Sequence, residues 1–403
     1  MHKSLYFDYN ATTPVDPRVY QAMEPYFQIY FGNPASQLHS KGWEAQSAVD
    51  LAREKVAQLI GAQTSEIAFT ASATESNNWA LKGLVDFFKE EYPGQVPHVL
   101  STQVEHASVR EPLLNLRQKG LVEVDFLPVT PEGFVTIEQL EKHRKPHTRI
   151  LSVIWVQNEV GTIQNMKALA EWAQKYNIIL HTDATQAVGK IEVNVTDTPV
   201  SLLSFSGHKI YGPKGIGALY IRKRKPKVIL RPLLHGGQQE SLGRSGTLNV
   251  PGIVGLGEAC SLAQKEFSEN STRARKQASW FWSELKSQFP ALQLNGPSLE
   301  SRTPYNLNIT FPNIQSFELL PLISPLCASG GSACSSGQLQ GSSVLQALGA
   351  PSQEGSTTLR LSHGRMTTNQ EFEKALEILS NALKTLGFLE RSRSSQSLTT
   401  VLK

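Results

Sequence analysis

The chain has 403 residues, 40% hydrophobic and 18% charged, which is enough apolar material for a large core and for two domains, or one domain with an appendage. Its formal net charge of +4 is small for this length and argues against a nucleic-acid partner. The three cysteines show no CxxC spacing, which argues against a disulfide framework or a structural zinc site.

The N-terminal residues contain no apolar signal core, and no apolar run approaches the roughly 20 residues that span a bilayer. We therefore expect a cytoplasmic protein that is not associated with a membrane.

The first two thirds of the chain alternate strand-like and helix-like segments. The expected strands are short apolar runs at residues 66–71, 98–102, 122–128, 149–156, 178–184, 202–207 and 216–222. Amphipathic patterns separate them, for example at residues 75–90 and 166–176. This alternation predicts an α/β fold with a mainly parallel, seven-stranded sheet.

The sequence pattern changes after about residue 263, where long polar helical patterns and a Ser/Gly-rich stretch appear. We predict a large α/β domain at 15–262 and a smaller α+β domain formed by 1–14 with 263–390. The basic, Ser/Thr-rich residues 391–403 are expected to form a mobile tail.

Lys209 follows an expected strand within Ser-Phe-Ser-Gly-His-Lys, at the end of the strand where α/β sheets place ligands. A lysine amine of lowered pKa can form a Schiff base with an aldehyde cofactor. The alternative is an ordinary loop lysine. Lys214 is a competing candidate, but its Gly-Pro-Lys-Gly context is typical of a turn.

Asp183 ends another expected strand, and Gln186 follows three residues later. Pyridoxal phosphate (PLP) works as an electron sink while its ring nitrogen stays protonated, and a buried aspartate keeps it so. Gln186 can reach the ring hydroxyl from the same loop. An aspartate that merely caps the following helix is the alternative interpretation.

Residues 71–75 (Ala-Ser-Ala-Thr-Glu) lie between an expected strand and an expected helix. The amides of Ala73 and Thr74 at the helix N-terminus suit an anion such as the cofactor phosphate. Ser72 and Glu75 also fit a plain capping box. His106, just after another strand, can stack on a flat ring and carry protons, although a structural histidine fits that position too.

Together with further segments, these motifs resemble those of the cysteine desulfurases of the NifS/IscS type, which are fold-type I PLP enzymes. The resemblance covers nearly the whole chain, at residues 9–14, 32–36, 74–76, 105–106, 158–161, 183–186, 204–219, 244–247, 330–335 and 360–365. The run SFSGHKIYGPKGIGALY at 204–220 is the most specific of them.

The resemblance implies a role for each matching residue. Lys209 would carry the cofactor, Asp183 would pair with the ring nitrogen, Gln186 with the ring hydroxyl, and His106 would stack on the ring. The phosphate would be held by Thr74, Ser206 and His208, and by Thr247 from a partner subunit, so the resemblance implies a homodimer. Asn158 and Arg360 would hold the substrate carboxylate.

The resemblance also makes Cys334 the sulfur acceptor, within the small residues Gly-Gly-Ser-Ala-Cys-Ser-Ser-Gly. It implies that L-cysteine becomes L-alanine, that Lys209 removes the Cα proton, and that His106 carries protons. Cys334 would then hold a persulfide and pass its sulfur to a protein such as an iron–sulfur scaffold. Residues 334–345 match the long-loop branch of the family.

Three positions depart from the family pattern. Ser72 and Gln157 stand where glycine and asparagine are frequent, and His363 replaces a common leucine near Arg360. The C-terminal tail does not resemble the scaffold-docking tail of the housekeeping enzymes, which leaves the sulfur acceptor open.

Rival interpretations are a selenocysteine lyase, an aminotransferase on the same scaffold, and a degenerate scaffold without chemistry. A metal-dependent hydrolase using His181, Asp183, His208 and Cys334 fits no familiar ligand spacing. We expect no metal.

Overall fold

In the computed structural model of the chain, residues 4–237, 239–240, 242–330, 342–349 and 356–391 are described. The strands of the central sheet are β2 (Ile67–Thr70), β3 (His98–Thr102), β4 (Glu123–Leu127), β5 (Thr148–Ser152), β6 (Ile179–Asp183), β7 (Leu202–Ser206) and β8 (Gly217–Ile221). The remaining strands are β1 (Leu5–Tyr6), β9 (Gln293–Leu294), β10 (Asn306–Phe311), β11 (Leu326–Cys327) and β12 (Thr357–Ser362).

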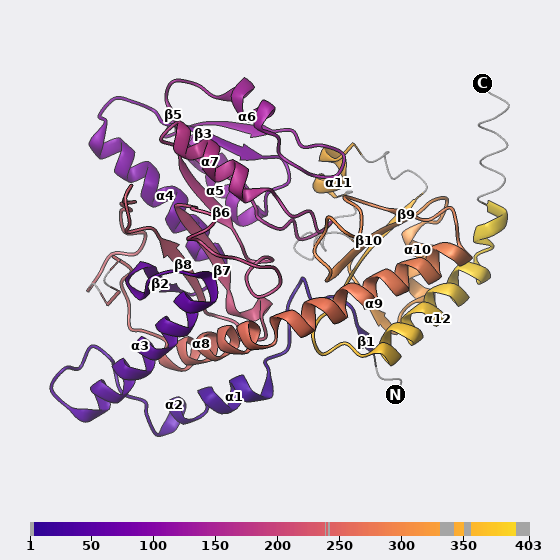
Figure 1. Cartoon of the computed structure of the whole chain (residues 1–403), viewed down its shortest axis with the longest axis horizontal. Coiled ribbons are helices and arrows are strands. Elements are labelled where there is room, and N and C mark those ends of the chain that lie inside the picture. The colour runs from indigo at the N-terminus through magenta and orange to yellow at the C-terminus, as the bar shows by residue number, and fades with distance from the viewer. Residues whose placement is uncertain (1–3, 238, 241, 331–341, 350–355, 392–403) are drawn as a thin grey trace.

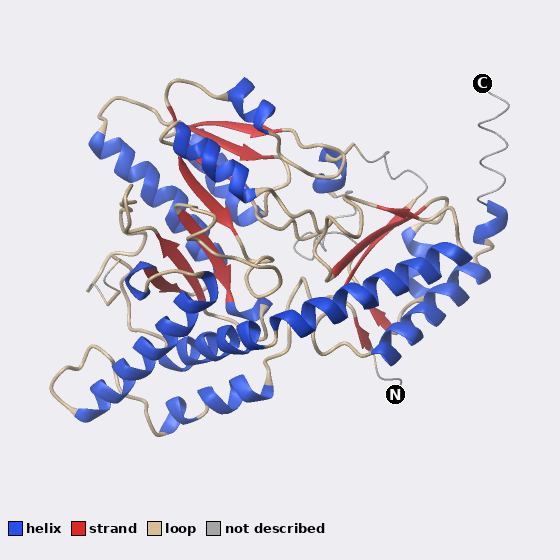
Figure 2. Cartoon of the chain, viewed as in Figure 1, coloured by secondary structure: helices blue, strands red, loops and turns tan. Residues whose placement is uncertain are grey.

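The helices alternate with the central strands and then dominate the C-terminal third (Figure 2). They are α1 (Pro17–Met23), α2 (Pro25–Gln28), α3 (Ser40–Ile60), α4 (Ala73–Glu91), α5 (Ala107–Gln118), α6 (Ile137–His143), α7 (Met166–Lys175), α8 (Val250–Lys265), α9 (Phe267–Gln288), α10 (Ser316–Leu322), α11 (Ser343–Ala347) and α12 (Asn369–Thr385). Within the described residues, no helix is both long and apolar enough to span a membrane.

The central sheet has the strand order β2-β8-β7-β6-β5-β3-β4. Five neighbouring strands, from β7 to β4, run parallel, whereas β8 is antiparallel to both β7 and β2. All seven expected strands are present, which confirms the prediction of a mainly parallel seven-stranded sheet. Because the parallel strands point the same way, the ends of β6 and β7 bring Asp183 and Ser206 to the same edge.

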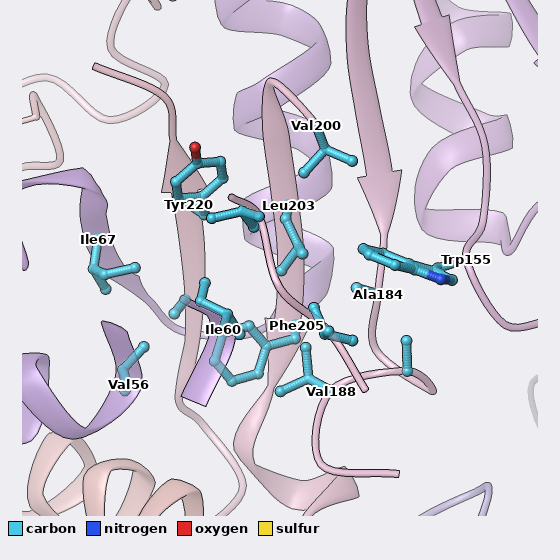
Figure 3. Close-up of a cluster of buried hydrophobic side chains, with 14 of the residues drawn as sticks. Val56, Ile60, Ile67, Trp155, Ala184, Val188, Val200, Leu203, Phe205 and Tyr220 are labelled. Atoms are coloured by element: carbon cyan, nitrogen blue, oxygen red, sulfur yellow. The ribbon is translucent and has the colours of Figure 1, made fainter. Parts of the chain in front are cut away.

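The inner strands of the sheet are buried on both faces, as their mainly apolar sequences predicted, whereas the edge strand β4 is partly exposed. Leu203 and Phe205 of β7 pack into one apolar cluster with Ile60 of α3. Figure 3 shows Leu203 and Phe205 among the side chains of this cluster, together with Val56 and Ile60 of α3. Leu202, on the opposite face of β7, belongs to a separate cluster with Trp79 of α4. The strand ends that carry candidate site residues are therefore fixed by packing from both sides.

The C-terminal third forms an antiparallel sheet in the order β12-β10-β9, with the long helices α9 and α12 packed against each other beside it (Figure 1). Strand β1, from the other end of the chain, pairs in parallel with β11. Leu5 and Phe7 consequently lie in the same apolar cluster as residues of α9, β10, β12 and α12. This arrangement brings the N-terminal segment beside the C-terminal sheet, next to the candidate site.

Candidate active site

One cavity of about 240 Å³ gathers nearly all of the predicted site residues. Its walls come from the ends of β6 and β7, the N-termini of α4 and α5, the N-terminal segment and β12. The lining residues are Asn10, Ala11, Ser72, Ala73, Thr74, His106, Ser108, Ile154, Asn158, Asp183, Thr185, Gln186, Ser206, His208, Lys209 and Arg360. Residues separated by up to 350 positions in the chain thus share one cavity.

Lys209 ends a short 3-10 turn, Gly207–Lys209, that directly follows β7. Its Nζ donates hydrogen bonds of 2.6 Å to the backbone carbonyls of both Asn10 and Ala11. The rival candidate Lys214 is exposed in the next turn and does not line the cavity. The geometry therefore favours Lys209 over Lys214 as the amine that faces a ligand.

Asp183 ends β6 and is only 3% exposed. Its Oδ1 accepts a hydrogen bond from the Thr185 amide at 3.0 Å, and its Oδ2 accepts one from Asn77 Nδ2 at 2.8 Å. The helix-cap interpretation is wrong, because no helix lies between β6 and β7, where every residue is described. Asp183 lines the cavity instead. Asn77, which sequence reasoning missed, comes from α4 and gave no local signal of its role.

The N-terminus of α4 forms one end of the cavity. Ser72 is its N-cap and accepts a hydrogen bond from the Glu75 amide at 3.3 Å, while Glu75 Oε2 accepts one from the Ala71 amide at 2.8 Å. The next two amides, of Ala73 and Thr74, have no carbonyl partner one turn earlier in the helix. The predicted capping arrangement is present, and it leaves the Ala73 and Thr74 amides available to an anion.

Two further groups approach this end of the cavity from the turn after β7. Ser206 and His208 both line the cavity. Burial, followed by the positive charges of Lys209, Lys214 and Lys190, lowers the pKa of His208 to about 4, so its ring is neutral at neutral pH. Its Nδ1 lies 3.1 Å from Thr12 Oγ1. A neutral imidazole can donate one hydrogen bond toward an anion.

His106 is the N-cap of α5 and also lines the cavity. Its Nδ1 accepts a hydrogen bond from the Ser108 amide at 3.1 Å, so in the neutral ring the proton is on Nε2. The preceding Glu105 is buried, and its Oε1 accepts hydrogen bonds from Thr102 Oγ1 and the Ile154 amide. Burial raises the pKa of Glu105 to about 8. Sequence reasoning singled out His106 but gave Glu105 no role.

Arg360, in β12, closes the side of the cavity opposite the large sheet. Its Nη2 forms a 2.6 Å ion pair with Asp8 Oδ1, and its Nη1 contacts the Asn158 carbonyl oxygen at 3.4 Å. The side chain is 1% exposed, and within the described residues its Nε has no hydrogen-bond partner. A buried guanidinium with a spare donor is suited to bind a carboxylate. The Asp8 contact had no sequence signal, since it joins residues 352 positions apart.

Among the described residues, one predicted site residue lies away from the cavity. Thr247 is exposed and does not line the cavity of its own chain. Cys334 lies outside the described residues. The unusual His363 is buried beside Tyr305 and Phe372, with its Nε2 2.9 Å from the Pro304 carbonyl oxygen, and it does not line the cavity either.

The metal-dependent hydrolase receives no support from this geometry. His181, one of its proposed ligands, is buried in the sheet between Ser152 Oγ at 2.8 Å and Ser204 Oγ at 3.2 Å. Among the residues that the structure describes, no group of three or more His, Cys, Asp and Glu side chains could hold a metal ion.

Comparison with known proteins identifies the family. The class-V aminotransferase model matches residues 5–374. The chain belongs to the class-V aminotransferases. It is 43% identical to the cysteine desulfurase IscS of Aeromonas hydrophila, covering 95% of this chain and 93% of that protein. It is 42% identical to a mitosomal cysteine desulfurase of Trachipleistophora hominis, covering 95% and 86%. A solved NifS-like protein matches with a TM-score of 0.86 and 37% identity over 95% of this chain and all of the other.

Enzymes of this family depend on PLP, and the residues of the cavity fit that cofactor. Lys209 supplies an amine for the aldehyde, and Asp183 a buried carboxylate for the ring nitrogen. The α4 amides, Ser206 and His208 offer donors that would suit the cofactor phosphate. Within the described chain, Thr185 Oγ1 lines the cavity as a buried hydroxyl without a hydrogen-bond partner.

Proposed function

We propose that the chain is a PLP-dependent cysteine desulfurase that converts L-cysteine to L-alanine and transfers the sulfur to Cys334 as a persulfide. The family and the relatives reported above support the reaction. The observation that carries the assignment of the site is the convergence of Lys209, Asp183 and Arg360 on one cavity. An amine, an acid and a guanidinium placed in this way match the aldehyde, the ring nitrogen and the substrate carboxylate.

When bound, PLP supplies an aldehyde that captures the substrate amine and a ring that accepts the negative charge left at Cα. Asp183 holds a proton at the ring nitrogen, and Gln186 approaches the ring oxygen. The amides of Ala73 and Thr74, with the Thr74 hydroxyl, Ser206 and His208, hold the phosphate. These roles agree with the position of each side chain on the cavity wall.

Arg360 and Asn158 orient the substrate through its carboxylate. The Nε of Arg360 is available for this contact, whereas its Nη2 is held by Asp8. A substrate fixed in this way directs its Cα–H bond toward Lys209. The amine of Lys209, released when the substrate takes its place, accepts the Cα proton at Nζ. His106 would stack on the ring and would carry a proton at Nε2.

The sulfur step uses the thiolate of Cys334. The thiolate attacks the substrate sulfur and forms an S–S bond, and the electron pair of the breaking C–S bond stays with the three-carbon fragment. Protonation of that fragment at carbon, followed by its release with the amino group retained as Lys209 takes back its place on the cofactor, gives alanine. The assignment of Cys334 rests on the resemblance of residues 330–335 to the family motif.

The partners and the location belong to the same proposal. We propose a homodimer in which Thr247, exposed in one subunit, reaches the phosphate of the other. The domain division at 15–262 and at 1–14 with 263–390 is supported by the apolar cluster that joins Leu5 and Phe7 to the C-terminal third. The persulfide passes to a protein acceptor such as an iron–sulfur scaffold, in the cytoplasm as for a bacterial IscS.

The test is incubation of the holoenzyme with L-cysteine and a thiol, with alanine and sulfide measured together. The native chain should yield the two products in equal amounts, and Cys334→Ala should lose nearly all of this activity. Cys260→Ala is the matched control, because Cys260 is buried in α8 and burial raises its pKa well above the usual range. Full cysteine activity in Cys334→Ala would overturn the persulfide step. A selenocysteine lyase would in addition retain selenocysteine activity in that variant.

A further inference from the structure

A second lysine, which neither the sequence motifs nor the reaction uses, is buried behind the cavity. Lys190 follows β6 in the turn that also carries Gln186, and the residue is 8% exposed. Its Nζ donates to Gln186 Oε1 at 2.5 Å and to Asn10 Oδ1 at 3.2 Å. A buried amine held by two side-chain amides next to the cofactor cavity needs a physical explanation, because an apolar side chain would fill the space at lower cost.

The two contacts of Lys190 determine how both amides are oriented. An ammonium donates hydrogen bonds and cannot accept them, so each amide must turn its oxygen toward Nζ. The opposite ends of the amides then point away from Lys190. Gln186 Nε2 donates to the Asn10 backbone carbonyl at 2.9 Å, and Asn10 Nδ2 donates to the Asn158 carbonyl at 3.1 Å.

This network connects Lys190 to Lys209 and to the Asn158 segment beside Arg360. The Asn10 carbonyl that accepts from Gln186 also accepts from Lys209 Nζ at 2.6 Å. Asn158, at the other end of the network, lies beside Arg360. Gln186 lines the cavity with its amide nitrogen fixed as a donor, which is the polarity that a negatively charged ring oxygen requires. With the amide reversed, its oxygen would repel that oxygen.

Lys190 titrates close to neutral pH. Burial, followed by the positive charges of Lys209 and Arg360, lowers the pKa of Lys190 to about 7. The positive charge of Lys190 acts in turn on His208 and His363, whose pKa values are both lowered to about 4, mainly by burial. Bound PLP adds a phosphate and a ring oxygen, and this negative charge favours the ammonium form of Lys190.

We propose that Lys190 is a positioning residue that orients the Gln186 amide and so makes Gln186 a hydrogen-bond donor to the cofactor ring oxygen. It acts through Gln186 and Asn10 and touches neither substrate nor cofactor. The proposal rests on the proposed role of Gln186 in cofactor binding. Replacement of this buried cation should change the absorbance spectrum of the cofactor and should not change the affinity for the substrate.

The experiment is a spectrophotometric pH titration of the cofactor in the holoenzyme without substrate. In Lys190→Met, the pKa of the imine between Lys209 and the cofactor should rise by about one unit, because a nearby positive charge and a donor to the ring oxygen are both lost. Lys214→Met is the matched control. It removes an exposed lysine, from the turn before β8, that also acts on His208 through its charge, and it should leave the cofactor titration unchanged.

A double variant tests whether Lys190 acts through Gln186. Gln186→Leu alone should raise the same pKa, and adding Lys190→Met should raise it by clearly less than the sum of the single shifts. If Lys190→Met does not fold, Lys190→Gln carries the test with the same expected direction. An unchanged cofactor pKa in the folded Lys190 variant, or full additivity with Gln186→Leu, would overturn the proposal.

Failure of the proposed function has a different signature. If borohydride fixes the cofactor on a residue other than Lys209, then the site assignment itself is wrong, whatever the Lys190 variants do. If the reduced cofactor is attached to Lys209 and the pKa of the cofactor imine is the same in the Lys190 variants as in the native protein, only the proposed role of Lys190 is wrong.

Discussion

The two sides of the cavity are built by different means. The proposed cofactor side consists of Lys209, Asp183 and the N-terminus of α4, each placed by the end of a buried strand or the start of the next helix. The proposed carboxylate side consists of Arg360 and Asn158, and Arg360 is held by Asp8 from the other end of the chain. The first side is a product of local chain geometry, whereas the second requires distant segments to assemble. Substitutions should therefore affect catalysis on the first side and substrate binding on the second.

The largest effect is expected on the cofactor side. Lys209→Ala should reduce kcat by roughly 1000-fold or more, because both the covalent anchor and the base at Cα are removed. Steady-state alanine production measures this loss. Lys214→Ala is the control and should retain native kcat. A Lys209→Ala variant within tenfold of native activity would remove the distinction between the two lysines.

Arg360→Lys tests the carboxylate side. We expect KM for cysteine to rise about 10- to 100-fold with a smaller change in kcat, because the loss of one charge-assisted hydrogen bond costs about 1.5–3 kcal/mol. The cofactor absorbance without substrate should stay native. A changed cofactor spectrum with an unchanged KM would contradict the assignment of Arg360 to the substrate carboxylate.

Asp16→Asn tests the ion pair that links the predicted large domain, which contains Asp16, to the predicted smaller domain, which contains Arg365. Asp16 caps α1 and pairs with the buried Arg365, which follows β12. Removing one partner of a buried pair should lower the free energy of unfolding by about 3 kcal/mol. The hydrogen bond from Arg18 is the main cause of the lowered pKa of Asp16, so this stability is present above pH 4 and is lost as the pH falls through the lowered value. Denaturant unfolding should show the difference between native and variant narrowing below about pH 4.

Glu105→Gln is expected to have the smallest effect on the free energy of unfolding, and this effect should vanish at low pH. Because burial raises the pKa of Glu105 to about 8, the folded protein holds an extra proton between the usual value of 4.5 and 8, and its stability falls as the pH rises through that range. The variant should match the native protein at pH 5, where both side chains are neutral, and become relatively more stable at pH 8. Equal unfolding curves at both pH values would show that Glu105 is charged in the fold.

The same comparison explains what could be predicted from the sequence. The seven strands were predictable because most contain a short apolar run, and Lys209, Asp183 and His106 lie at or shortly after the ends of these strands. Asp8 and Lys190 could not be predicted in the same way. The pairing of Asp8 with Arg360 depends on β1 joining β11, and the role of Lys190 depends on Asn10 arriving from the N-terminal segment. Neither contact leaves a local pattern, because its partners are 352 and 180 positions apart.

The most direct test of the site is the identity of the lysine that binds the cofactor. The holoenzyme would be reduced with borohydride, digested, and its labelled peptide sequenced by mass spectrometry. The geometry predicts the label on Lys209, whose Nζ lies at the cavity between the carbonyls of Asn10 and Ala11. A label on Lys190 or Lys214 would contradict the site described above.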